Sequence, residues 1–208
     1  MRIAINAWFW DSPTTGSGQY VRRLVEQLSA MEGVEAIPVR AERRSQKAGA
    51  GLRSQFYKLW FEQFCFPIAC ARLGADIAHV PYWASPLVTP LPTVVTIHDL
   101  IPLLLRDYRG SLPVRLYTAL VSLTARRAAL ILTDSQASRK DIITKLRLPQ
   151  ERVRTIYLGI SEQYTPVPAS DDQAIRARYG LPERYLLYLG GFDVRKNITT
   201  LLRAYRLA

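Results

Sequence analysis

The segment Thr93–Asp99, TVVTIHD, constrains the fold more than any other part of this sequence. Its first five residues are all β-formers and lie between Pro92 and the polar pair His98 and Asp99, a pattern typical of a short buried strand. The apolar residues are nearly continuous rather than alternating, as in a parallel strand that is covered on both faces. Ligands of open α/β sheets bind outside the carboxyl ends of the strands, so we expect the chemistry of this chain around His98.

Strand-like and helix-like segments alternate along the first three quarters of the sequence. A turn-rich loop separates the first strand from the first helix, and Ser135 can cap a later helix because its hydroxyl can accept from a first-turn amide. Pro67 should kink or end the helix that contains it. The order predicts an α/β fold with a doubly wound parallel sheet, Rossmann-like in type. The predicted strands are 2–7, 36–39, 77–80, 93–97, 130–133 and 153–156, and the predicted helices are 20–31, 52–71, 113–129 and 136–146.

The composition changes near residue 160, which predicts a domain boundary. Residues 1–160 form the Rossmann-like domain, and residues 161–182 are rich in Pro and Asp, as linkers are. Residues 183–208 then predict one strand, at 185–189, and one helix, at 197–208. One strand and one helix bury too little apolar surface to make a domain, so we expect a fragment of a longer two-domain protein.

The sequence is strongly basic, with a formal net charge of +11 over 208 residues. This charge suits anionic partners such as phosphorylated ligands, an acidic membrane surface or nucleic acid, although a merely solvated basic surface would give the same total. We find no zinc motif, basic zipper or RNA-binding signature, so nucleic acid is not expected. No apolar run approaches the roughly 18 residues that span a bilayer.

Cys65 and Cys70 lie five residues apart in an apolar stretch, and this spacing matches no common metal motif. We expect unreactive core thiols in a reducing compartment. Because Met1 and Arg2 lead straight into a predicted strand, we expect a cytoplasmic protein, with peripheral contact to the inner face of the membrane as an extension of that expectation.

Gly16 and Gly18 open the first predicted helix directly after the first strand. Glycines allow a ligand close to the backbone, and amides at a helix amino terminus favour phosphate. The alternative is a loop that only turns the chain. A dinucleotide fingerprint is not complete here, because Val21 stands where its third glycine would be, so an NAD site is not expected.

Two other groups of residues could carry chemistry. His98 and Asp99 could exchange a proton or hold a sugar hydroxyl, or His98 could simply be hydrogen-bonded within the fold. Arg195 and Lys196 follow a glycine pair and suit a diphosphate, whose developing charge they could neutralise, or they could be solvated surface charges. No metal site is expected.

Two aromatic segments have equally open interpretations. The Tyr82-Trp83 pair could stack on a sugar ring, or it could be structural. The segment 40–72 combines basic residues with an aromatic helix whose apolar face is wider than one core contact needs. It could bind an anionic membrane surface, or it could be a core helix under a solvated loop.

Several motifs together resemble the retaining glycosyltransferases of the large family 4, which have the two-domain GT-B fold. They are TTGSGQYVRRL, VVTIHDLIPL, ILTDSQASRKDI, VRTIYLGISEQY and YLLYLGGFDVRKNITTLLRAY, and their order and spacing cover nearly the whole chain. The resemblance assigns residues 1–160 to the amino-terminal, acceptor-side domain and residues 183–208 to the start of the donor-binding domain. It implies that an acceptor contacts the Tyr82-Trp83 loop and the segment around residues 40–66.

The resemblance implies transfer of a sugar from a nucleotide-sugar donor to a saccharide or lipid-linked saccharide acceptor, with retention of configuration, as in the synthesis of cell-envelope polysaccharides. It implies no metal and no cofactor, because cationic side chains neutralise the diphosphate. Gly16 and Gly18 match the loop that approaches the donor phosphates, His98 the histidine near the transferred sugar, and Arg195 and Lys196 the pair that holds the diphosphate.

The family's paired glutamates and its nucleotide pocket belong to the second domain and have no counterpart in this sequence. We therefore expect residues 1–208 alone to be inactive or nearly so. The alternative function is a non-catalytic basic module that docks on anionic lipid or nucleic acid, with binding that weakens steeply as salt is added.

Overall fold

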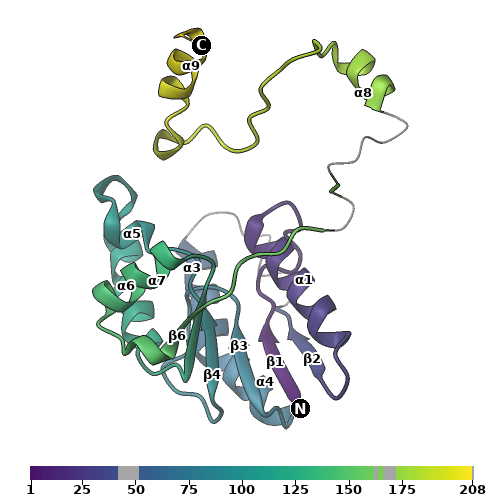
Figure 1. The fold of residues 1–208 in the computed structure, drawn as a ribbon. Coiled ribbons are helices and arrows are strands. Elements are labelled where there is room, and N and C mark those ends of the chain that lie inside the picture. The colour runs from purple at the N-terminus through teal and green to yellow at the C-terminus, as the bar shows by residue number, and fades with distance from the viewer. Residues whose placement is uncertain (42–51, 162–163, 166–171, 208) are drawn as a thin grey trace. The chain divides into compact units, whose positions relative to one another are not determined.

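The computed structural model describes residues 1–41, 52–161, 164–165 and 172–207 (Figure 1). The chain forms two compact units, Met1–Gly159 and Ile160–Ala208, and each is described by itself. The division falls next to the boundary predicted at residue 160. The predicted segment 40–72 is described only outside residues 42–51.

The first unit is built on a six-stranded sheet in which every neighbouring pair is parallel. The strand order is β2-β1-β3-β4-β5-β6, so the chain leaves β1 toward one edge and later returns to its other side. This reversal is the switch point at which doubly wound folds bind ligands. The Rossmann-like prediction is confirmed. The strands are β1 Arg2–Asn6, β2 Glu35–Val39, β3 Ile77–Val80, β4 Thr93–Thr96, β5 Leu130–Thr133 and β6 Val153–Thr155.

Two helices of this unit, α1 and α7, begin at side-chain caps. The Thr15 hydroxyl accepts from the Gly18 amide at 3.1 Å, and the Ser135 hydroxyl accepts from the Ser138 amide at 3.1 Å, as predicted for Ser135. The helical segments are α1 Gly16–Ser29, α3 Leu52–Trp60, the π-helical η1 Phe61–Cys65, α4 Phe66–Arg72, α5 Ile101–Leu104, the 3₁₀ turn η2 Arg106–Tyr108, α6 Leu112–Ala125, α7 Gln136–Leu146 and the 3₁₀ turn η3 Gln150–Arg152.

Alternation along β1 shows how the sheet is covered. Ile3 and Ile5 point to the face where they pack with Val21 of α1. Ala4 points to the opposite face and belongs to a core that includes Phe66 of α4. Apolar residues of α6, α7 and the neighbouring strands complete this core. Both faces of the sheet are therefore covered, which is why its strands read as continuous apolar runs.

Pro67 does not end its helix, so that part of the prediction is wrong, while a kink at this residue stays a prediction. The helical path continues to Arg72 through the wider turn Phe61–Cys65, in which the Phe66 amide donates to the Phe61 carbonyl five residues back. A proline ring clashes with the carbonyl four residues before it, here that of Gln63. A π turn shifts the carbonyls of this segment out of α register, so the ring is accommodated without a break.

The second unit contains α8 Asp172–Tyr179, the 3₁₀ turn η4 Val194–Lys196 and α9 Ile198–Leu207. The helix predicted at 197–208 is present as α9. The strand predicted at 185–189 is absent, because a strand exists only through hydrogen bonds to a neighbour and the described residues of this unit supply none. Leu189 is accordingly 91% exposed.

The cysteines fit the sequence-based interpretation. Both Cys65 and Cys70 are free thiols, and burial raises the pKa of Cys70 to about 12. A thiol with that pKa stays protonated at neutral pH and is a poor nucleophile. Among the helices of the described ranges, none is long and apolar enough to pass through a bilayer.

Candidate functional site

His98 lies just beyond the carboxyl end of β4 and Asp134 just beyond the carboxyl end of β5. These strands are parallel neighbours, so the two side chains meet at one edge of the sheet, with His98 Nδ1 at 2.6 Å from Asp134 Oδ2. A carboxylate can only accept, so Nδ1 carries the hydrogen and donates it. This tautomer leaves the Nε2 lone pair of a neutral imidazole available to a ligand. The His98 side chain is 30% exposed.

Tyr20, in the first turns of α1, holds the other side of the imidazole. Its ring meets His98 edge-on, with centroids 4.8 Å apart and planes at 89°. Its hydroxyl lies 3.3 Å from the Thr96 hydroxyl at the end of β4. Tyr20 thereby links the start of α1 to the end of β4. The predicted site has three parts: Gly16 with Gly18, His98, and Arg195 with Lys196. The first two parts lie at the same edge of the sheet.

The Thr96 hydroxyl also meets His79 Nε2 of β3 at 3.0 Å. His79 is 5% exposed, and burial lowers its pKa to about 4. This histidine is therefore neutral at physiological pH. Its place is inside the sheet, where it supports Thr96 rather than facing a ligand.

We expect His79 to make stability depend on pH. Between pH 6.5 and 4 the unfolded histidine takes up a proton that the folded one does not, so the free energy of unfolding falls as pH falls. The expected loss is on the order of 3 kcal/mol. His79→Gln keeps a hydrogen-bonding group but cannot titrate, so urea unfolding of this variant should lack that part of the decline. Parallel curves for both proteins would contradict the assignment.

Asp99, predicted to be catalytic with His98, has a different position. It is exposed, and its carboxylate accepts from the Ile101 amide at 3.0 Å, at the start of α5. The carboxylate that pairs with His98 is that of Asp134 instead. A catalytic role for Asp99 stays a prediction.

Gly16 and Gly18 differ sharply in their surroundings. A Cβ at Gly18 would overlap the Ser12 carbonyl and come within 2.9 Å of the Phe9 carbonyl oxygen, whereas one at Gly16 would meet nothing within 4 Å. Gly18 is thus required by packing of the loop against α1. Gly16 lies in open space in the first turn, where helix amides lack intrahelical acceptors.

Comparison with known proteins identifies the family. The model of Glycosyltransferase Family 4 matches residues 14–164 of the chain. The chain belongs to glycosyltransferase family 4. The matched range includes α1, His98 and Asp134, so the site described above lies within the part of the chain that matches the family.

Two curated relatives of this family 4 chain are mannosyltransferases of Escherichia coli. The O-antigen chain mannosyltransferase B is 29% identical over 94% of this chain and 57% of its own length. The serotype-specific mannosyltransferase WbdA is 31% identical over 67% of this chain and 19% of its own length. The chain therefore spans about half, or less, of the length of these relatives.

One solved structure supports the fold. The Anabaena protein HepE, crystallised with UDP and glucose, superposes with a TM-score of 0.50 over 86% of this chain and 50% of its own, at 14% identity. A sucrose-phosphate synthase of Thermosynechococcus elongatus covers 86% of this chain and 96% of its own, with a TM-score of 0.48 at 16% identity.

Arg195 and Lys196 of this family 4 chain lie in the second unit, in the turn η4. Asp193 caps this turn: its carboxylate accepts from the Arg195 amide at 3.1 Å and from Arg195 Nε at 3.2 Å. Both cationic side chains belong to exposed residues. Their predicted contact with a donor diphosphate stays a prediction.

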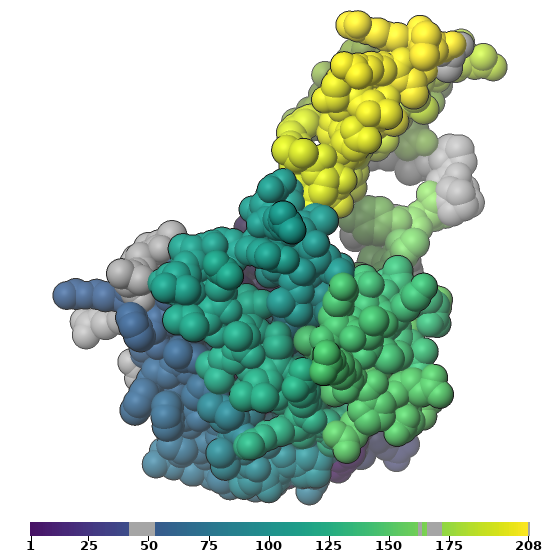
Figure 2. Space-filling view, turned by 90° about the vertical axis from the view of Figure 1, so that its left-hand side faces the viewer, coloured from purple at the N-terminus to yellow at the C-terminus, as the bar shows by residue number. Residues whose placement is uncertain are grey.

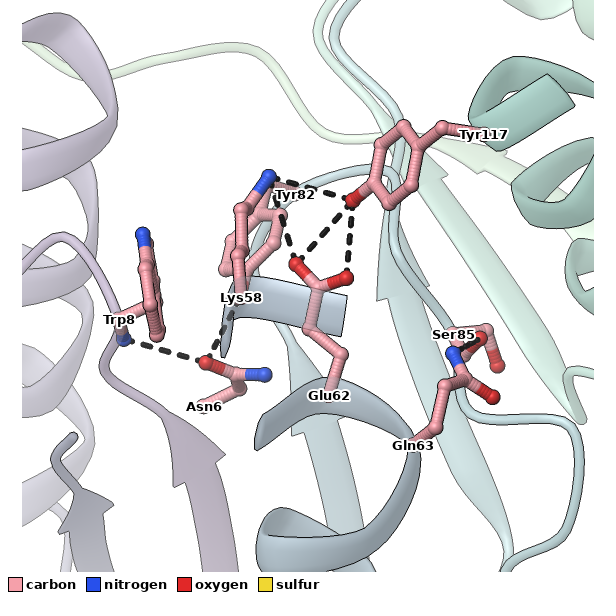
Figure 3. A network of polar contacts seen from close by, with 8 residues as sticks. All are labelled: Asn6, Trp8, Lys58, Glu62, Gln63, Tyr82, Ser85 and Tyr117. Atoms are coloured by element: carbon pink, nitrogen blue, oxygen red, sulfur yellow. Dashed lines mark hydrogen bonds and ion pairs between the residues drawn. The ribbon is translucent and has the colours of Figure 1, made fainter. Parts of the chain in front are cut away.

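Tyr82 and Trp83, predicted to bind an acceptor, are both engaged within the first unit. Tyr82 is 7% exposed, and its hydroxyl donates to Asn6 Oδ1 at 2.9 Å (Figure 3). Trp83 is half-buried and its indole N–H donates to the Val121 carbonyl at 3.2 Å. Tyr82 therefore offers no free ring face in this structure. An acceptor contact of either residue remains a prediction.

A buried polar network beside Tyr82 was not foreseen from the sequence. Glu62 is fully buried, and its two carboxylate oxygens lie 3.1 and 2.9 Å from the Tyr117 hydroxyl of α6 (Figure 3). Lys58 Nζ lies 3.3 Å from Glu62 and 3.2 Å from the Tyr117 hydroxyl. Burial raises the pKa of Glu62, while the Lys58 ammonium acts in the opposite direction.

The Lys58 ammonium also stands over three aromatic rings, 5.4 Å from the centroid of Phe9, 5.1 Å from Tyr82 and 5.0 Å from Tyr117. Such cation–π contacts and the Glu62 charge together compensate its partial burial. The network joins Asn6 at the end of β1, Tyr82 just beyond β3, and residues of α3, η1 and α6. We assign it a structural role, since its charged and hydroxyl groups pair with one another, although Nδ2 of Asn6 is buried without a hydrogen-bond partner among the described residues. Within the described ranges no cluster of side chains fits a metal ion.

Proposed function

We propose that the chain forms the acceptor-side part of a retaining glycosyltransferase, which moves a hexosyl group from a nucleotide-sugar to a hydroxyl of a saccharide or lipid-linked saccharide. The observation that carries this proposal is the His98–Asp134 pair, fixed beside the start of α1 in a family 4 chain. Because a carboxylate holds one imidazole nitrogen, the other nitrogen points in a defined direction, which allows it to orient a sugar.

In the proposed reaction, residues of the first unit position the donor and do not act as a nucleophile. The Nε2 lone pair of His98 accepts a hydrogen bond from a hydroxyl of the transferred sugar. The first-turn amides of α1, near Gly16, face the donor phosphates, where the helix dipole favours negative charge. Asp134 holds the imidazole tautomer and is a positioning residue.

Arg195 and Lys196 supply the second half of the proposed mechanism. The bond between the anomeric carbon and the phosphate oxygen breaks, and its electron pair leaves with the nucleoside diphosphate. The two cations stabilise that charge as it develops. The acceptor hydroxyl forms the new carbon–oxygen bond on the same face, and its proton passes to the leaving phosphate. No metal or other cofactor takes part in this scheme.

The relatives suggest a donor to test first. Both are named as mannosyltransferases, one of the O-antigen chain, so we propose a mannosyl donor and a cell-envelope polysaccharide as the product, made in the cytoplasm. The UDP and glucose bound to HepE carry no weight for the donor, because that protein is only 14% identical. The non-catalytic alternative is not favoured, since the chain belongs to a family of transferases.

The test is a donor screen on the protein expressed from its complete reading frame. Nucleotide sugars are offered singly, and release of nucleoside diphosphate is followed with and without saccharide acceptors. We expect turnover with one mannosyl donor, and a product whose anomeric configuration, read by NMR, matches that of the donor. An inverted product would contradict retention, and no turnover with any nucleotide sugar would contradict the donor class.

A further inference from the structure

The helix that runs through α3, η1 and α4 carries aromatic side chains on its outer side as well as on its core side. Phe56, Trp60, Phe64 and Ile68 recur every four residues and are 69%, 55%, 52% and 50% exposed. The rings of Trp60 and Phe64 stack on each other with centroids 4.5 Å apart. A surface helix normally turns polar side chains outward, so this exposed stripe needs an explanation.

Helix α6 repeats the pattern. Its inner side buries Val121 and Ala125, yet Leu112, Leu116 and Leu123 on its outer side are 66%, 63% and 53% exposed. The exposed leucines are four and seven residues apart, which places them on one side of the helix.

The two helices are neighbours on the same side of the sheet, and a loop ties them together. Lys58 of α3 contacts Tyr117 of α6, as described above. The Leu87 amide donates to Gln63 Oε1 at 2.8 Å, and the Leu87 carbonyl accepts from Arg127 at 3.0 Å. Figure 2 shows α3 in blue and α6 in teal on this side of the unit. We call it the apolar face, made of Phe56, Trp60, Phe64, Ile68, Leu87, Val88, Leu112, Leu116 and Leu123.

The described helices that form the apolar face carry no exposed carboxylate. Residues 52–75 contain a single acidic residue, Glu62, which is fully buried and paired with Lys58, and residues 108–133 contain none. Exposed arginines border the face at both helices, namely Arg53, Arg72, Arg109, Arg115, Arg126 and Arg127. Aromatic and leucine side chains ringed by arginines complement an anionic bilayer, whose interface accepts rings and whose lipid phosphates accept guanidinium hydrogens.

We propose that the apolar face docks the protein on an anionic membrane surface. The aromatic stripe enters the boundary between headgroups and acyl chains, and the bordering arginines contact lipid phosphates. The proposal depends only on this side of the first unit and not on the donor, so its test is lipid binding rather than turnover.

The first experiment measures co-sedimentation of the full-length protein with phosphatidylcholine vesicles, with and without phosphatidylglycerol. We expect binding only where phosphatidylglycerol is present. Trp60→Ser should weaken this binding about tenfold, because one interfacial aromatic is lost, while Trp60→Phe should keep it. The matched control is Met31→Ser, which removes a 55% exposed apolar side chain at the end of α1, on the opposite face of the sheet.

The second experiment distinguishes binding through the arginines that border the apolar face from binding through the net charge of the protein. Arg109→Gln with Arg115→Gln should weaken binding to the anionic vesicles about tenfold or more. Arg23→Gln with Arg154→Gln changes the net charge equally, on α1 and β6, and should have a much smaller effect. Equal losses for both pairs would overturn the proposal. So would absence of binding to either vesicle, or self-association that depends on Trp60 without any lipid binding, which would assign the face to a second copy of the chain.

Discussion

We expect His98→Ala in the full-length transferase to lower turnover at least about 100-fold, because it removes the group proposed to orient the transferred sugar. The free energy of unfolding should change by less than about 1 kcal/mol, since the side chain is partly exposed at the edge of the sheet. Initial rates of nucleoside diphosphate release and urea unfolding of the same preparation measure the two effects.

Two neighbouring carboxylates give this prediction its controls. In Asp134→Asn the amide can offer an N–H to Nδ1, which favours the wrong imidazole tautomer, so turnover should fall about tenfold or more. Asp99→Asn should have less effect, since the Asp99 carboxylate caps α5 through the Ile101 amide. Near-normal turnover in His98→Ala would remove this histidine from the mechanism. A larger loss in Asp99→Asn than in Asp134→Asn would restore Asp99 as the partner.

The sequence located His98 because a run of β-formers followed by a polar pair marks a strand end. Asp134 follows β5 in the same way, yet nothing local says that β4 and β5 are neighbours. That adjacency depends on strand order, which arises from the packing of whole helices on the sheet. The sequence therefore predicted the histidine and missed the carboxylate that orients it.

Glu62 is a second residue whose partner, distant in the sequence, could not be predicted from the sequence. Lys58 and Glu62 stand four residues apart, a spacing that reads as an exposed ion pair on a helix. Glu62 does pair with Lys58, but Glu62 is fully buried, and its second partner, Tyr117, is 55 residues farther along the chain. The only sequence signal was an isolated acidic residue within a strongly apolar helix, and such a residue needs partners if it is buried. The π turn beside it likewise follows from Pro67 in its helical context rather than from propensity.

The two glycines in the first turn of α1 show how one motif can combine two roles. Both were predicted to approach donor phosphates, because glycine was taken to mean access for a ligand. The structure shows that the space at Gly18 is occupied by the chain itself, by carbonyls of the loop that precedes α1. Packing therefore accounts for the glycine at position 18, and a contact of Gly16 or Gly18 with donor phosphates stays a prediction.

We therefore expect Gly18→Ala to destabilise the fold by roughly 2–3 kcal/mol or more, because its methyl group would displace backbone carbonyls rather than a flexible side chain. The Thr15 cap on the Gly18 amide would be strained by the same shift. The measurement is the free energy of unfolding in urea. Loss of turnover in this variant would follow from the loss of structure, since α1 carries Tyr20 against His98.

Gly16→Ala is the matched control and separates folding from donor binding. The Cβ has open space and the backbone is outside the left-handed region, so stability should be unchanged or raised by up to about 1 kcal/mol. If the donor phosphates lie against this turn, the added methyl should raise the KM for the nucleotide sugar while the fold is intact. Unchanged kinetics in Gly16→Ala would show that the donor phosphates do not lie against this turn. Wild-type stability in Gly18→Ala would show that the loop moves aside easily, and the packing role of this glycine would then be wrong.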